Sequence, residues 1–357
     1  MRLLTTYRAT GADLPLHDPT PAHPGVAMEG YFWRVTVPET GQSVIALIGV
    51  NQGPRGAWAT LGLAGHPQGS LAVAAHEGAT ADPRRLGAVA GTAFVANARS
   101  VRVDLGPDHR LALTVTDPAQ WPDRRLGGSS VFHSVPALNQ YWHPWLLGGR
   151  AIGHAVLAGE RVELTGGQVY GEKNWGREGF PESWWWGQAH GFAEREVCVA
   201  FAGGQVSAGP LRTEVTAVVV RMPGGRVLRW GNPGTSPVTA LVTNHTWRLR
   251  GRLLRPDGLW RVEVDGSAPL EEAHVLPVPL PSEHRNIAGA LEHLGGRMQV
   301  RVTRQSPRSR RAELVWEGVS HVAGLEHGSL ALAAHEIAGR GGAAEATHAP
   351  PMRRTPH

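Results

Sequence analysis

The chain has 357 residues, enough for one large domain or two ordinary ones with a substantial core. Hydrophobic residues make up 41% and charged residues 18%, and no stretch approaches the ~20 apolar residues of a membrane-spanning helix. The net charge is +5, but the arginines are spread widely, without the clustered basic patch and interleaved aromatics typical of nucleic-acid binding. We therefore expect no nucleic-acid partner. An anionic lipid surface fits the excess charge better, and a solvated surface is the default.

The sequence shows no pattern typical of a secretory signal, a disulfide or a metal site. Residues 1–15 offer only a Leu-Leu pair in place of the apolar run of a secretory signal, so we expect a cytoplasmic protein, with peripheral membrane contact as an extension of its positive charge. The one cysteine, Cys198, lies in the run VCVAF, which predicts a buried thiol. Histidines number 18, but no metal-binding spacing such as His-Glu-x-x-His occurs. We expect no metal.

Alternation of apolar and polar residues with a period of two dominates the chain, starting at residues 31–37, YFWRVTV. Residues 101–105 and 111–115 repeat the pattern on either side of a Gly-Pro-Asp turn, which predicts a hairpin. Residues 247–253 and 260–264 do so around Arg-Pro-Asp-Gly, a strong turn signal. Further alternating segments lie at 218–222, 226–230, 298–302 and 314–316. Clear alternation predicts antiparallel sheets with one apolar and one wetted face.

Helical patterns are scarce. Residues 328–339 predict a short helix, residues 284–296 one or two helical turns, and residues 70–79 fit a short helix or a strand. The segment 340–357 is rich in Gly, Ala and Pro, which predicts a disordered tail.

We therefore predict an all-β protein of two barrel-like or sandwich-like halves with few short helices. Residues 1–24 would form an N-terminal extension, residues 25–182 the first β domain and residues 183–339 the second. The boundary between the halves falls in a tryptophan-rich segment.

That segment, Tyr170 to Gln188, reads YGEKNWGREGFPESWWWGQ and holds four of the 13 tryptophans. If its first part is extended, Tyr170, Glu172 and Asn174 share one face, and Lys173 and Trp175 share the other. Glycines and a proline then mark a turn. The segment therefore predicts a strand, a turn and a second strand.

On the second strand, Trp184, Trp186 and Gln188 share one face, with Trp185 opposite. A carboxyl and an amide beside several indoles suit an apolar reaction chamber. The alternative is a structural network in which Glu172 bonds to Lys173 or to the backbone and braces the turn. The residues alone leave both interpretations open.

The segment resembles the signature of the tocopherol cyclase family, whose plant members carry Ser-Glu-Lys-Asn-Trp-Gly, then Phe-Pro, then Trp-x-Trp-x-Gln. The strand that begins at Gly30-Tyr31-Phe32, and residues 136–149 with Trp142, are similar to two other parts of that family. The resemblance runs from about residue 30 to about residue 328. The matching signature residues are Gly171, Glu172, Lys173, Asn174, Trp175, Gly176, Phe180, Pro181, Trp184, Trp186 and Gln188.

The resemblance implies two lipocalin-like halves and a cofactor-independent cyclisation of a prenylated hydroquinone or related terpenoid lipid. An acid protonates the side-chain alkene, and the phenol oxygen captures the tertiary carbocation. We expect Glu172 to be the acid, assisted by Lys173, Asn174 or His190. The expected substrate contacts are Tyr31, Trp142, Tyr170, Trp175, Phe180, Trp184, Trp186 and Gln188.

The sequence departs from the plant pattern at two places that concern the substrate. Glu182 stands where plant members have a basic residue, and Ala189-His190 stands where they have Cys-Asn. Related two-barrel proteins include hydratases of isoprenoid double bonds, in which water captures the same cation. Hydration, or lipid binding without catalysis, is therefore an alternative function.

Overall fold

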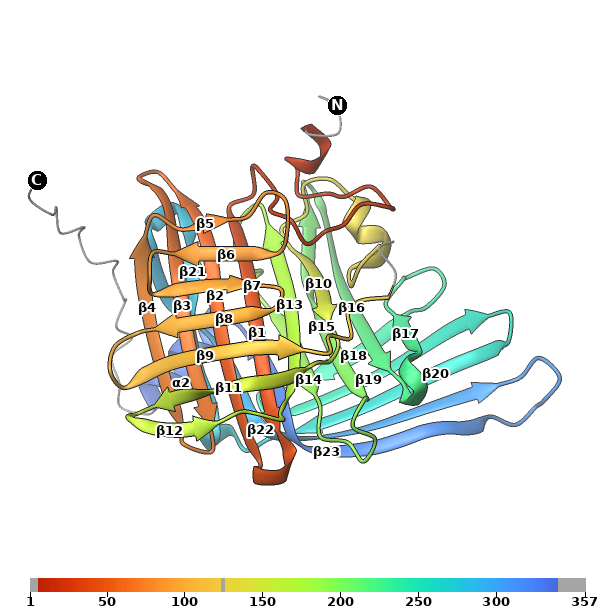
Figure 1. Ribbon diagram of the computed structural model, residues 1–357. Coiled ribbons are helices and arrows are strands. Elements are labelled where there is room, and N and C mark those ends of the chain that lie inside the picture. The colour runs from red at the N-terminus through yellow and green to blue at the C-terminus, as the bar shows by residue number, and fades with distance from the viewer. Residues whose placement is uncertain (1–5, 123–125, 340–357) are drawn as a thin grey trace, which may run out of the picture.

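The computed structural model describes residues 6–122 and 126–339. Strands dominate and form two antiparallel sheets, one of 13 strands and one of 10 (Figure 1). This confirms the predicted all-β fold of two halves with few short helices. The domain limits, including the extension at 1–24, stay a prediction, and the tail predicted at 340–357 lies outside the described residues.

The first sheet folds over on itself. Its strand order is β4-β3-β2-β1-β13-β11-β9-β8-β7-β6-β5, and the later strands cross the face of β1–β4 (Figure 1). A hydrophobic core with Trp33, Leu61 and Phe94 fills the space between the two layers. The strands are β1 (Met28–Val37), β2 (Gln42–Gly53), β3 (Gly56–His66), β4 (Ser70–Glu77), β5 (Thr80–Ala81), β6 (Gly87–Ala90), β7 (Phe94–Asn97), β8 (Ser100–Asp104), β9 (His109–Thr116), β10 (Tyr141–Leu146), β11 (Arg150–Leu157), β12 (Glu160–Glu163) and β13 (Gln168–Gly176).

The second sheet has the order β17-β16-β15-β14-β23-β22-β20-β19-β18, with β21 paired to β22. Its own core includes Trp230, Trp247 and Trp260. The strands are β14 (Trp184–Ala189), β15 (Cys198–Ala208), β16 (Leu211–Arg221), β17 (Val227–Trp230), β18 (Val238–Val242), β19 (Thr246–Arg255), β20 (Gly258–Ser267), β21 (His274–Leu280), β22 (Arg285–Gln305) and β23 (Glu313–Gly328).

Helical structure is brief and lies between or after the strands. The α-helix α2 spans Leu330–Gly339, which confirms the helix expected at 328–339. Short 3-10 helices occupy Pro38–Thr40, Ser130–Ser134, Pro223–Gly225, Leu270–Glu272 and Pro281–Glu283.

The predicted hairpins are confirmed, because β8 pairs with β9, β16 with β17, and β19 with β20. Of residues 70–79, which fit a helix or a strand, Ser70–Glu77 form strand β4. The helical turns expected at 284–296 are wrong, since that segment begins the long strand β22. Burial explains the error: residues 289–294 of β22 are buried on both faces, so the polar alternation that marks a strand is missing.

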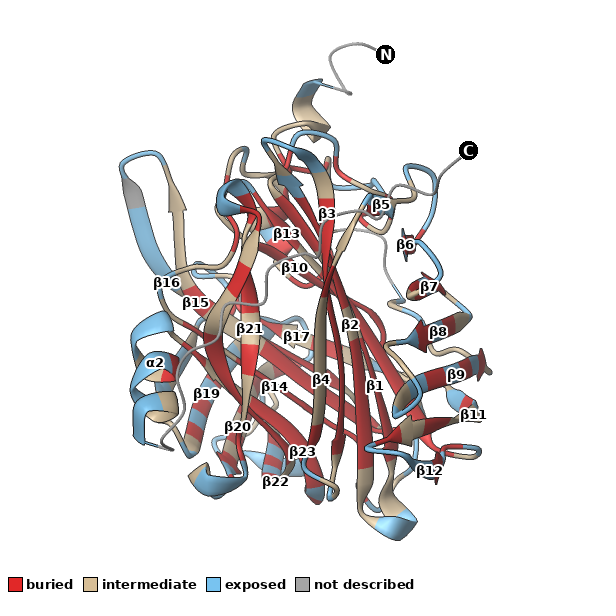
Figure 2. Cartoon of the chain, turned by 90° about the vertical axis from the view of Figure 1, so that its left-hand side faces the viewer, coloured by how far each residue is buried: buried red, intermediate tan, exposed pale blue. Residues whose placement is uncertain are grey.

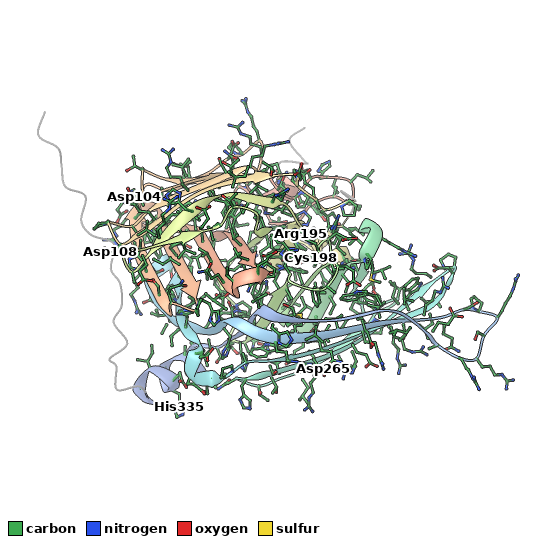
Figure 3. All side chains as sticks on the ribbon, turned by 60° about the horizontal axis from the view of Figure 1, so that its bottom comes forward. Asp104, Asp108, Arg195, Cys198, Asp265 and His335 are labelled. Atoms are coloured by element: carbon green, nitrogen blue, oxygen red, sulfur yellow. The ribbon has the colours of Figure 1, made fainter. Side chains whose placement is uncertain are left out.

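The two sheets pack against each other along strands that are buried for most of their length (Figure 2). A hydrophobic cluster at this junction takes Trp142 and Tyr170 from the first sheet and Trp186, Ala200 and Val219 from the second. Cys198 also lies there, fully buried as predicted, whereas Asp104, Asp108 and Asp265 lie on the outside of the molecule (Figure 3). The tryptophan-rich segment crosses this junction.

Candidate functional site

Strands β13 and β14 line opposite sides of the junction. They are not a hairpin: β13 pairs with β1 and β10 in the first sheet, and β14 pairs with β15 and β23 in the second. Glu172 and Asn174 of β13 face the second sheet, whereas Lys173 points into the opposite layer, as the alternation predicts. The turn between the strands therefore carries the chain from one sheet to the other.

A cavity opens between the two sheets, and its walls are mainly apolar. Phe32, Glu172 and Asn174 border it from the first sheet, and the hairpin strand β21 closes part of one side. Its lining includes Trp142, Phe180, Trp184, Trp186, Leu276 and Glu326. Five of the predicted substrate contacts thus border one cavity: Tyr31, Trp142, Phe180, Trp184 and Trp186.

Glu172 is the polar centre of this cavity wall. It is 7% exposed, and three side chains donate hydrogen bonds to the same carboxyl oxygen, Oε2. Trp142 Nε1 lies 2.8 Å away, Trp186 Nε1 2.7 Å and the Tyr170 hydroxyl 2.6 Å. Burial raises the pKa of Glu172 above its usual value, and the three donors oppose that rise.

The donor arrangement distinguishes the two carboxyl oxygens. Because Oε2 already accepts three hydrogen bonds, a proton on Glu172 resides on Oε1. Oε1 has no hydrogen-bond partner among the described residues, and Glu172 borders the cavity. The geometry therefore presents one acidic O–H at an apolar, indole-rich wall, which is an arrangement suited to general-acid chemistry.

A second carboxyl, Glu326 of β23, borders the same cavity. Glu326 is not among the site residues predicted from the sequence. Trp184 Nε1 donates a hydrogen bond to its Oε1. Glu292 of β22 lies directly opposite Glu326 in the strand pairing and is fully buried. Burial raises the pKa of both carboxyls. The charges of Glu326 and Glu172 raise the pKa of Glu292 further, and the charge of Glu172 raises the pKa of Glu326 further. The signal in the sequence was the tripeptide Leu-Glu-His, which occurs at 291–293 and again at 325–327.

Residues 106–329, more than half of the chain, match the tocopherol cyclase-like family. The protein belongs to this family. A segment of 73 residues is 39% identical to a probable chloroplastic tocopherol cyclase of Oryza sativa subsp. japonica, and one of 89 residues is 34% identical to the chloroplastic tocopherol cyclase of Zea mays. These segments cover 20% and 24% of this chain, but only 15% of the rice protein and 19% of the maize protein.

Solved structures show the fold of this tocopherol cyclase-like protein in other proteins. Kievitone hydratase from Nectria haematococca superposes with a TM-score of 0.50 at 10% identity, covering 90% of this chain and 94% of that one. CghA superposes with the same TM-score at 12% identity, covering 85% and 88%. At such identities the likeness establishes the architecture.

Several residues of the tocopherol cyclase-like signature hold the sheets together and do not line the cavity. Gln188 accepts a hydrogen bond from Arg34 Nη1 at 2.9 Å, and its amide nitrogen lies 3.7 Å from the thiol of Cys198. Arg34 also donates to the carbonyls of Leu294 and Val322. The structure therefore places Gln188, expected as a substrate contact, in a buried brace between the sheets.

Lys173 and Trp175 of the signature point away from the cavity, into the layer covered by the N-terminal segment. Lys173 is fully buried, and its Nζ lies 3.1 Å from Glu29 Oε1 and 3.0 Å from His23 Nδ1. Burial alone would raise the pKa of Glu29, but Lys173 and His23 lower it to about 2. The expected alternative of a Glu172–Lys173 pair is wrong, because the partner of Lys173 is Glu29.

The remaining expected residues occupy supporting positions. Trp175 stacks on His23 with ring centroids 4.3 Å apart. Tyr31 borders the cavity, but its hydroxyl donates to Glu29 on the opposite layer. His190 is fully buried with Nε2 3.5 Å from the Leu147 carbonyl, away from the cavity lining, and burial lowers its pKa to about 3.

Residues 6–122 and 126–339 contain neither a metal-binding cluster nor a membrane-spanning helix. No group of three or more His, Cys, Asp or Glu side chains in this part of the chain is placed to hold a metal ion. Within the same ranges, none of the helices combines the length and apolar character needed to cross a bilayer.

Proposed function

We propose that the protein is an acid catalyst that closes a ring on a prenylated hydroquinone or a related isoprenoid lipid. The observation that carries this proposal is the Glu172 carboxyl at the apolar cavity wall, with Oε2 held by three donors and Oε1 open toward the cavity. Membership in the tocopherol cyclase-like family supports it. No cofactor takes part in this chemistry.

The reaction begins when Glu172 transfers its proton to the trisubstituted alkene of the side chain. A tertiary carbocation forms, and the indole faces of Trp142, Trp184 and Trp186 along the cavity stabilise it by about 0.5–2 kcal/mol each. The phenol oxygen then bonds to the cationic carbon and closes the ring. The apolar lining keeps water from capturing the cation first.

The cavity lining offers a polar group for the aromatic head of the substrate and an apolar wall for its isoprenoid tail. Asn174 borders the cavity near Glu172, and its side-chain amide can form a hydrogen bond with a hydroxyl group of the hydroquinone. Phe180 and Leu276 extend the apolar wall, and they belong to a hydrophobic cluster with Trp184. A flat polar head and a flexible apolar tail fit this distribution.

Hydration of an isoprenoid double bond is the second candidate. Protonation by Glu172 would be identical, but water held by a polar group of the cavity would capture the cation. Ser129 and Gln140 border the cavity and could hold such a water molecule. The two candidates therefore differ in the product.

Access from a lipid surface is the expected route for an insoluble substrate. The hairpins β19–β20 and β22–β23 project from the body of the protein (Figure 1). Leu254 is 72% exposed and Leu314 is 52% exposed near the ends of these hairpins, and the turn between β22 and β23 carries Arg308, Arg310 and Arg311. We propose peripheral contact there with an anionic membrane, tested by co-sedimentation with phosphatidylserine vesicles. Loss of binding on Leu254→Asp with Leu314→Asp is expected, and unchanged binding would contradict it.

Turnover of a prenylated hydroquinone in deuterated water tests the catalytic proposal. Cyclisation predicts a chromanol with one solvent deuterium on the ring carbon next to the oxygen-bearing quaternary carbon. A deuterated tertiary alcohol would instead establish hydration. Tight binding of the substrate without any product would show a lipid-binding protein and refute both.

A further inference from the structure

Ring closure by this chemistry needs a base as well as an acid. When the phenol oxygen bonds to the carbocation, it becomes a positively charged oxonium and must lose its proton. Glu172 cannot serve for this directly unless the alkene and the phenol oxygen both reach its carboxyl. The cavity wall opposite β13 holds another carboxyl, Glu326.

Strand pairing places Glu326 in a row that faces Glu172. Trp186, Glu326 and Glu292 are directly opposite one another on β14, β23 and β22, so their side chains leave the same face of the second sheet. Trp186 from this row donates to Glu172 Oε2 across the junction. Directly opposite residues have Cβ atoms about 4.5–5.5 Å apart, so the carboxyls of Glu326 and Glu292 are immediate neighbours.

The two paired carboxyls differ in their partners. Glu326 accepts the indole N–H of Trp184, which stabilises its ionised form. Glu292 is fully buried, and neither of its oxygens has a hydrogen-bond partner within residues 6–122 and 126–339. The charged and titratable groups that face them are Glu172 from β13 and Arg34 from β1. Two adjacent buried carboxyls cannot both ionise cheaply, so the unpartnered Glu292 retains the proton.

We propose that Glu326 is the base that accepts the phenol proton, and that Glu292, neutral behind it, holds the pair at a single negative charge. This inference rests on the proposed function. In the reaction, the Glu172 O–H bond breaks as a C–H bond forms on the alkene. The phenol O–H bond then breaks as the C–O bond forms, and the proton passes to Glu326. The enzyme resets when that proton returns to Glu172 through water that enters as the product leaves.

Infrared spectroscopy of the full-length protein tests the charge assignment without any turnover. The carbonyl stretch of protonated carboxyls at neutral pH should lose one component in Glu292→Gln, and it should be unchanged in Glu160→Gln, a control at an exposed position of β12. A Glu292→Gln spectrum identical to that of the wild type would overturn the assignment. This readout stands even if the wild type does not cyclise the probe, a result that would refute only the proposed function.

Turnover of a prenylated hydroquinone tests the role of Glu326. Glu326→Gln should bind the substrate, as followed by tryptophan fluorescence, but turn over about 10²–10⁴-fold more slowly, the usual contribution of a general base. Glu326→Asp keeps the carboxyl and should recover part of the rate. A Glu326→Gln enzyme with the wild-type rate, or an Asp variant as slow as the Gln variant, would overturn the proposal.

Discussion

Replacing Tyr170 by Phe removes a single oxygen atom and the shortest of the three hydrogen bonds that reach Glu172 Oε2, at 2.6 Å. A hydrogen bond to a charged acceptor contributes about 1.5–3 kcal/mol, and 1.36 kcal/mol corresponds to one pKa unit. The hydrogen bond stabilises the carboxylate, so its loss should raise the pKa of Glu172 by about one to two units. The donors from Trp142 and Trp186 remain in place.

The pH dependence of kcat/KM reports this change. The acid must be protonated to act, so activity declines as pH rises through the pKa of Glu172, and the alkaline limb in Tyr170→Phe should move to higher pH by the same one to two units. Tyr7→Phe is the control, because the Tyr7 hydroxyl donates to the Ser134 carbonyl instead of to Glu172. An alkaline limb that stays in place or moves to lower pH in Tyr170→Phe would refute the assignment of Glu172 as the acid.

Three further perturbations probe the supporting structure. Lys173→Met removes the buried cation beside Glu29, which keeps only His23 and Tyr31 as partners, and should cost about 3–5 kcal/mol in urea unfolding. Part of this loss should be recovered in the double variant with Glu29→Gln, and full stability of the single variant would contradict the ion pair. Burial raises the pKa of Glu326 above its unfolded value near 4.5, so its contribution to stability is complete below that value and is lost as pH rises through the folded pKa. Glu326→Gln should therefore flatten the decline of stability above pH 4.5, and parallel stability curves would show the reasoning to be wrong. In Gly30→Ala the new methyl group would overlap the Asn174 amide, so KM should rise severalfold with the fold intact, whereas an unchanged KM would remove Asn174 from substrate binding.

The faces of strands β13 and β14 were predictable because successive side chains of an extended strand point to opposite sides. Glu172 looks toward the cavity and Lys173 toward the N-terminal segment, as alternation requires. The same pattern could not say how far along a strand the cavity extends. Gln188 shares the face of Trp186, but at its depth Arg34 and Cys198 fill the junction.

The repeated Leu-Glu-His tripeptide marks both carboxyls in the sequence, but no local pattern shows that they lie side by side. Glu292 and Glu326 come together only because β22 and β23 pair in one particular register, which is set by a long hairpin and by irregularities along it. β22 is also buried on both faces near Glu292, so its sequence was interpreted as helical. The family signature at 170–188 contains the proposed acid, Glu172, but not the proposed base, Glu326.

The most direct test of the account is the rate of ring closure in Glu172→Gln under single-turnover conditions. The amide retains the shape of the side chain but has no acidic proton, so substrate should still bind while the rate falls by about 10²–10⁴-fold relative to the wild type. A Glu172→Gln enzyme that forms chromanol at the wild-type rate would contradict the central claim that this carboxyl protonates the alkene.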